Sequence, residues 1–113
     1  MKKLIFLITL LMFSCKEHYT REEVITMLES NNTDSVLTAC KFISENKDTT
    51  YNHYLLKDPY QWKITHNWRF LGMNGYEGRM KTLRKVTGIA PPNKITSTPD
   101  SSIVEFYRKV LKE

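Results

Sequence analysis

The chain contains 113 residues, of which 17 are basic and 12 are acidic, so its formal net charge is +5. This length is enough for one domain with a single modest core and excludes a second domain. The charge is unevenly spread, because residues 16–56 hold four basic and seven acidic side chains, whereas residues 57–94 hold eight basic and two acidic ones. The middle of the chain is therefore cationic.

The first fifteen residues have the layout of a bacterial secretory signal. Two lysines precede an apolar run over residues 4–13 that only Thr9 interrupts. This run is about half as long as a helix that spans a bilayer, so we predict that residues 1–14 are a signal peptide that is removed. The segment from Leu11 to Cys15 resembles the lipobox of bacterial lipoproteins. That resemblance implies that Cys15 is lipidated and becomes the first residue of the mature protein.

A short polar tether at residues 15–19 precedes the predicted domain at 20–113. Its Lys16-Glu17 pair resembles the export signal of surface lipoproteins in the Bacteroidota. Both resemblances imply a lipid-anchored protein of the bacterial cell envelope, at the outer membrane and facing either the periplasm or the cell surface. In that location we expect no nucleic-acid partner. The cationic middle of the chain is better suited to anionic lipid head groups or an acidic protein face.

Capping residues and apolar periodicity predict the helices of the domain. A capping box formed by Thr20 and Glu23 opens the first of them. Thr49 or Thr50 opens the third, and the residue before Pro59 closes it. The predicted helices run over residues 20–30, 34–45, 49–58, 74–87 and 100–112.

Between Leu28 and Leu56 the chain is similar to a HEAT repeat. The matching positions are those that hold the two antiparallel helices of such a repeat together: Leu28, Val36, Ala39, Ile43, Asp48 and Leu55. Ala39 stands at the position where the two helices approach each other closely. The resemblance implies an all-α fold of about four to five helices, built on a HEAT-like αα-hairpin. Only one such hairpin is found, so other elements are expected to close its core.

The second half of the chain resembles small uncharacterised lipoproteins of the Bacteroidota type. The residues that carry this resemblance include Ile64-Thr65-His66, Gly72-Met73, Pro91-Pro92 and Pro99-Asp100. This family implies no activity.

Aromatic side chains gather between residues 60 and 75, where no helix is predicted. We expect an ordered loop, or a short extended stretch, that packs over the helices through these rings, because no second convincing strand is available for pairing. Burial in the core is the favoured interpretation of the rings in so short a chain. The alternative is a stacking platform for a sugar or peptide, formed by Tyr60, Trp62 and Trp68.

No residue pattern in the chain indicates catalysis. His18, His53 and His66 lack the spacing of metal ligands, and we predict neither a metal nor a cofactor. The glycines fit neither a phosphate loop nor a dinucleotide fingerprint. Cys40 lies on an apolar helical stripe, where burial raises the pKa of a thiol. An acid/base role for His66 with Glu77 is left open, although hydrogen bonds that fix the loop are favoured.

These patterns favour a non-enzymatic protein-interaction module over an enzyme. Either cationic side chains on the predicted helix 74–87 or the loop at 60–75 are expected to contact an envelope or extracellular protein. The cationic side chains are expected to face solvent: Arg79, Lys81, Arg84 and Lys85. A solvated helix face without a partner is the plainer interpretation of the same charges. A protective or immunity-type lipoprotein fits the first class. The second hypothesis is a glycan- or peptidoglycan-binding domain that uses the aromatic cluster.

Overall fold

The computed structural model describes residues 18–113, so the predicted signal segment at 1–14 and Cys15 lie outside the described residues. The described residues form five α-helices and no β-strand, which confirms the predicted all-α fold. The helices are α2 (Arg21–Leu28), α3 (Thr33–Asn46), α4 (Asn52–Lys57), α5 (Gly75–Thr87) and α6 (Ser101–Leu111). Two short 3-10 turns accompany them, η1 (Thr49–Tyr51) and η2 (Trp68–Phe70).

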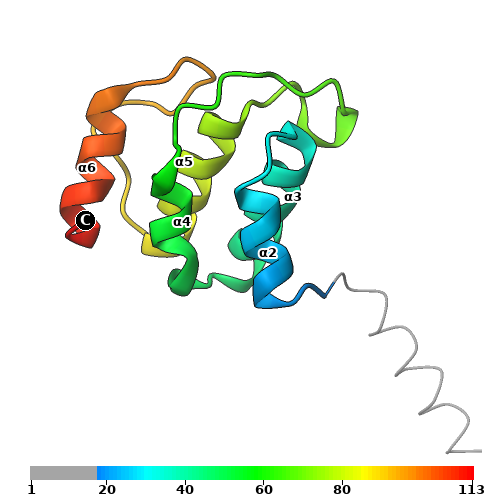
Figure 1. Cartoon of the computed structure of the whole chain (residues 1–113). Helices are drawn as coiled ribbons and strands as arrows, with labels where there is room; N and C mark the ends of the chain where they lie inside the picture. Colours follow the sequence, from blue (N-terminus) through cyan, green and yellow to red (C-terminus); the bar gives the residue numbers. More distant parts are fainter. Residues whose placement is uncertain (1–17) are drawn as a thin grey trace, which may run out of the picture.

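The packing centres on α3 and α5, which make the most extensive contact between helices (Figure 1). α2 packs against α3, α4 packs against α5, and α6 lies at the outer edge of the fold against α4 and α5. The predicted HEAT-like hairpin paired the second helix with the third. The structure does not confirm that hairpin, because the main neighbours of α3 are α2 and α5 rather than α4.

The close approach between α3 and α5 occurs at Gly78. A Cβ atom at this position would overlap the Leu37 side chain, and it would lie 3.8 Å from Cys40 Sγ. Our sequence analysis expected a close approach at Ala39, within the hairpin between Leu28 and Leu56. Ala39 is fully buried, but the residue that lets α3 and α5 meet is the glycine on α5.

Side chains at the start of four helices accept hydrogen bonds from the first amides of those helices. The predicted capping box is present, because the Thr20 side chain accepts from the Glu23 amide at 3.2 Å and the Glu23 carboxylate accepts from the Thr20 amide at 3.1 Å. Asn32 caps α3, Asn74 caps α5 and Asp100 caps α6. Such caps satisfy donors that have no partner within the helix.

One hydrophobic cluster joins all five helices. Its fully buried members include Val24, Val36, Ile43, Leu55, Met80, Leu83, Ile103 and Tyr107. Cys40 is buried in the same cluster, as the apolar stripe of its helix predicted.

The segment over residues 58–74 crosses one end of the helices as an ordered loop (Figure 1). Thr33 at the start of α3 donates a hydrogen bond of 3.2 Å to the Lys63 carbonyl oxygen. The Thr65 hydroxyl donates to the Asp34 carboxylate, also in the first turn of α3. These bonds confirm an ordered loop and tie it to the beginning of α3.

The start of α2 and the C-terminus lie at the end of the fold that is opposite to this loop (Figure 1). Arg21 donates a hydrogen bond of 2.9 Å to the Thr50 hydroxyl, which follows the far end of α3. His53 Nδ1, at the start of α4, lies 3.5 Å from Glu113 Oε2. The loop is therefore free of both ends of the described chain.

Candidate functional site

Large hydrophobic side chains are exposed together on the loop. Five of them have exposed fractions between 42% and 91%: Tyr60 (42%), Trp62 (70%), Ile64 (55%), Trp68 (83%) and Leu71 (91%). We call these five side chains the loop surface. Among the described residues, Ile89 is the only other large hydrophobic residue that is exposed. The favoured interpretation that the rings pack into the core is therefore wrong for both tryptophans.

The backbone around η2 explains why these side chains face solvent. The Asn67 side chain caps this short turn by accepting a backbone hydrogen bond at 3.0 Å. Within the turn, Phe70 faces inward and is 8% exposed, whereas Trp68 before it and Leu71 after it face outward. Leu71 has a φ of 51°, a left-handed conformation that a non-glycine residue adopts only when its surroundings hold it there. The loop is thus held by polar bonds and one inward ring.

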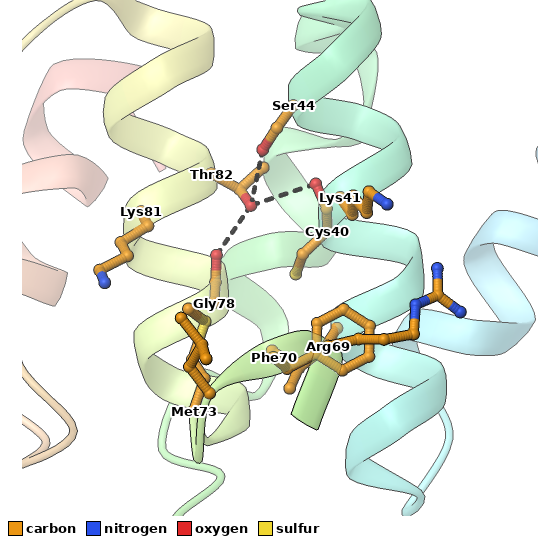
Figure 2. A pocket seen from close by; sticks show the side chains of 11 residues that line it. Cys40, Lys41, Ser44, Arg69, Phe70, Met73, Gly78, Lys81 and Thr82 are labelled. Atoms are coloured by element: carbon orange, nitrogen blue, oxygen red, sulfur yellow. Dashed lines mark hydrogen bonds between the residues drawn. The ribbon is translucent and has the colours of Figure 1, made fainter. Parts of the chain in front are cut away.

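A cavity of about 270 Å³ opens between α3 and α5 beside the loop surface (Figure 2). We call this cavity the apolar pocket. Its hydrophobic lining comes from both helices and the loop: Leu37, Cys40, Phe70, Leu71, Met73 and Gly78. Because Leu71 belongs to both features, the pocket adjoins the loop surface at this residue.

The hydroxyl groups in the apolar pocket already have hydrogen-bond partners. The Thr82 hydroxyl shares its one proton between the Gly78 carbonyl oxygen at 2.7 Å and the more distant Cys40 carbonyl oxygen at 3.3 Å, and its oxygen accepts from Ser44 at 3.1 Å (Figure 2). Burial raises the pKa of the Cys40 thiol to about 11, so the thiol stays protonated at neutral pH and is not activated as a nucleophile. The pocket offers apolar contact rather than a reactive group.

The charged side chains that line this pocket are all basic. Lys41 on α3 and Lys81 on α5 flank it on opposite sides, and Arg69 reaches it from the loop (Figure 2). Each lysine has a carboxylate on its own helix, with Lys41 Nζ 3.9 Å from Glu45 and Lys81 Nζ 2.7 Å from Glu77. Arg69 forms no ion pair with any residue of the described range 18–113.

A second cavity, of about 320 Å³, lies next to Trp62. Tyr60 and Trp62 line it together with side chains that can hydrogen-bond: Asn31, Thr33, Asp58, Gln61 and Lys63. A small number of placed polar groups beside aromatic walls is common in sites that bind small molecules. The structure therefore brings Tyr60 and Trp62 to one cavity, which Trp68 does not line.

Arg79 does not belong to a cationic surface. It is 1% exposed, and its guanidinium donates to the carbonyl oxygens of Leu28, Tyr54 and Leu55 at 2.6, 2.8 and 3.1 Å. It also donates to the Gln61 side chain at 3.2 Å. The prediction that Arg79 faces solvent is wrong, because the backbone of two other helices offers it buried acceptors.

A signal for this burial was present in the sequence. Arg79 follows Tyr76 by three residues and precedes Leu83 by four, so it lies on the apolar stripe of α5 rather than opposite it. The charge of Arg79 favours exposure, but its position on the helix indicates burial.

The other three predicted cations of α5 differ in their surroundings. Lys81 is half-buried beside the apolar pocket and paired with Glu77. Arg84 and Lys85 are exposed near the end of the helix. Since one residue of an α-helix adds about 1.5 Å, Lys85 lies roughly 15 Å along the axis from the beginning of α5, where the loop ends. Only Lys81 adjoins the loop surface.

The structure brings no metal constellation together among residues 18–113. No group of three or more histidine, cysteine or acidic side chains in this range is placed to hold a metal ion. Glu77 pairs with Lys81, while His66 is exposed on the loop. None of the described helices has the length and apolar character that a membrane span needs.

The fold and these surfaces define a small helical domain with an exposed apolar region. Comparisons of the chain with protein-family models, curated proteins and solved structures found no match.

Proposed function

We propose that this protein is a non-enzymatic, lipid-anchored interaction module of the bacterial cell envelope, and that it binds a protein partner through the loop surface. The observation that carries the proposal is the exposure of several large hydrophobic side chains on one loop, up to 83% for Trp68 and 91% for Leu71. Contiguous apolar patches on soluble proteins commonly mark interaction sites. Tryptophan is also prominent among the residues that dominate interface energies.

The fixed backbone of the loop supports a binding role. Hydrogen bonds from Thr33 to the Lys63 carbonyl oxygen and from Thr65 to Asp34 hold the loop against α3. Ordering a flexible loop on binding costs affinity. A loop whose backbone is already ordered avoids most of that cost.

An anchor on Cys15 is consistent with this use of the loop surface. Cys15 precedes His18, the first described residue, by three positions, so the chain between them spans at most about 11 Å. The loop lies beyond the opposite end of α3, a helix of 14 residues that is about 21 Å long. An anchored domain would therefore present its exposed rings away from its own membrane, toward a partner in the aqueous space.

Capture of a partner from envelope extract by the full chain tests this proposal. The double variant Trp62→Ser with Trp68→Ser is expected to abolish capture, because it removes the two largest rings of the loop surface. Ile89→Ser is the matched control, since Ile89 is 42% exposed but lies outside the loop. The proposal fails if the double variant still captures the partner, or if the control loses it as well.

The second cavity favours one alternative, a glycan- or peptidoglycan-binding domain. Tyr60 and Trp62 offer ring faces there, and Asp58 and Asn31 offer hydrogen bonds. Under this alternative, insoluble cell wall retains the full chain, and Trp62→Ala or Asp58→Ala releases it. Trp68→Ala is the control, because Trp68 does not line that cavity. Retention that survives Trp62→Ala would rule the alternative out.

A further inference from the structure

We infer that the apolar pocket receives one bulky hydrophobic side chain from the protein partner, and that an acidic residue stands next to that side chain in the partner. The inference rests on the proposed function and names the chemistry of the partner. It joins two features that adjoin each other, the loop surface and the pocket.

The volume of the pocket fits one large side chain. It measures about 270 Å³, which is below the roughly 300–1,000 Å³ of cavities that hold drug-sized ligands. A dry cavity of about 150 Å³ accepts benzene. The pocket therefore has room for the side chain of a phenylalanine, leucine or tryptophan, without the backbone that carries it.

The interior of the pocket favours hydrocarbon. Leu37, Cys40, Phe70 and Met73 supply much of its lining. The Thr82 hydroxyl is already engaged with two carbonyl oxygens and Ser44. A polar group inserted beside these side chains would lose its hydration without gaining an equivalent partner.

The rim of the pocket selects an acidic neighbour for the inserted side chain. Its charged residues are Lys41, Arg69 and Lys81, and no aspartate or glutamate lines it. The two lysines are paired on their own helices, which leaves the Arg69 guanidinium without a carboxylate from the described range 18–113. An arginine can hold a carboxylate through two parallel hydrogen bonds. A basic residue at the same place would meet like charges.

Leu71 connects the pocket to the loop surface. It forms part of the wall and is nevertheless 91% exposed. A partner that fills the pocket must also cover Leu71 and remove it from water. A filled central pocket surrounded by contacts that exclude water is the arrangement in which a few residues dominate binding energy.

Two short peptides test the inference on the full chain held in lipid nanodiscs: N-acetyl-Phe-Glu-amide and N-acetyl-Phe-Lys-amide. Saturation-transfer NMR of the phenyl protons is expected to detect binding, with the glutamate peptide several-fold tighter than the lysine peptide. Arg69→Gln is expected to remove most of that difference. Absence of binding by both peptides, or equal or tighter binding of the lysine peptide, overturns the inference.

Two variants that fill the pocket from α3, Cys40→Leu and Ser44→Leu, locate the bound phenyl group. Each is expected to abolish the phenyl signal, and circular dichroism shows whether the variant has kept its helices. Signal that persists in a folded variant overturns the inference. If both variants unfold, nuclear Overhauser effects in the unmodified chain are measured instead. A phenyl group in the pocket must give such effects to the Met73 methyl group, and the absence of these effects overturns the inference.

Failure of this inference can be told apart from failure of the proposed function. If capture of the protein partner depends on Trp62 and Trp68 but survives filling of the pocket, the inference fails and the interaction module stands. If capture does not depend on these tryptophans, the proposed function itself fails.

Discussion

Arg79 Nη2 on α5 donates a hydrogen bond of 2.6 Å to the backbone carbonyl oxygen of Leu28, the last residue of α2. The same guanidinium reaches the carbonyl oxygens of Tyr54 and Leu55 in the last turns of α4. Carbonyl groups at the end of a helix lack partners within it. Desolvation lowers the pKa of Arg79, but arginine remains charged in proteins. One buried cation therefore supplies hydrogen-bond donors to carbonyl groups at the ends of two helices.

We predict that Arg79→Met lowers the free energy of unfolding by about 3 kcal/mol or more. The variant leaves several buried carbonyl groups without a donor, and each such loss costs roughly 1–3 kcal/mol. Urea titration followed by circular dichroism measures the change. Arg84→Met on the exposed part of the same helix is the control and should stay within about 0.5 kcal/mol of the unmodified chain. Similar losses in both variants would show that the buried bonds are unimportant.

Ala39→Leu is expected to destabilise the fold by about 1–3 kcal/mol, because added carbon atoms overpack a full core. Ala39 is completely buried on α3. Ala90→Leu is the matched control, since Ala90 is exposed after the end of α5. Thr38 is a poor control, because its hydroxyl donates a hydrogen bond of 2.7 Å to the Asp34 carbonyl oxygen. Thermal unfolding of the two alanine variants should separate them, and equal midpoints would contradict the packing described for α3.

Arg69→Glu is expected to weaken partner capture more than Arg84→Glu with Lys85→Glu does. Arg69 lines the apolar pocket, whereas the other two cations lie near the far end of α5. All three are exposed, so folding should change by less than about 1 kcal/mol. The difference should be largest at low salt, where exposed charges are screened least. A stronger effect of the double variant would move the binding face from the loop to the end of α5.

The stability of the fold should fall in acid, in part through Asp48. Thr50 donates to the Asp48 carboxylate from its hydroxyl at 2.6 Å and from its amide at 2.9 Å, and these bonds lower the pKa of Asp48 from its usual value of 3.8. Because the pKa is lower in the folded state, the stabilisation is present above 3.8 and is lost as the pH falls through the folded-state pKa. The free-energy difference between the unmodified chain and Asp48→Ala should therefore shrink in acid. A difference that stays constant from neutral pH into acid would refute this role.

Cys15→Ser is expected to abolish lipid attachment, because only a thiol accepts the diacylglyceryl group in a lipobox. Mass spectrometry of the protein from membranes should show an acylated Cys15 at the N-terminus of the unmodified chain. The variant should be uncleaved or soluble. Ser14→Ala serves as the control, since it keeps a small residue before the cysteine. An unmodified Cys15 in the native protein would contradict the lipid anchor, which is one part of the proposed function.

The local parts of the fold could be predicted from the sequence, whereas the contacts between distant residues could not. The pairs Thr20 with Glu23 and Asn74 with Glu77 lie three residues apart, so the helix starts that they define are visible in a short window. Arg79 reaches Leu28 across 51 positions, and no local pattern shows which helix end lies opposite a given side chain. Its place on the apolar stripe of α5 was the one available indication.

The loop surface shows a second limit of sequence analysis. Aromatic composition alone does not distinguish a buried ring from an exposed one, and the small size of the chain favoured burial. The turn from Trp68 to Phe70 determines which ring is buried, because it directs Phe70 inward and Trp68 outward. The apolar pocket also depends on the approach of α3 to α5 at Gly78, which only the assembled fold reveals.

The hydrogen bonds that hold the loop have a consequence for how such a protein can diversify. The loop is tied to α3 through the Lys63 carbonyl oxygen and the Thr65 hydroxyl, whereas Trp62 and Trp68 project into solvent. If the loop surface binds a partner as proposed, recognition and folding depend on different atoms of the same segment. Under that proposal, substitutions at the exposed positions would change the partner while the scaffold stays the same, and a new specificity could be grafted onto the loop without redesigning the helices.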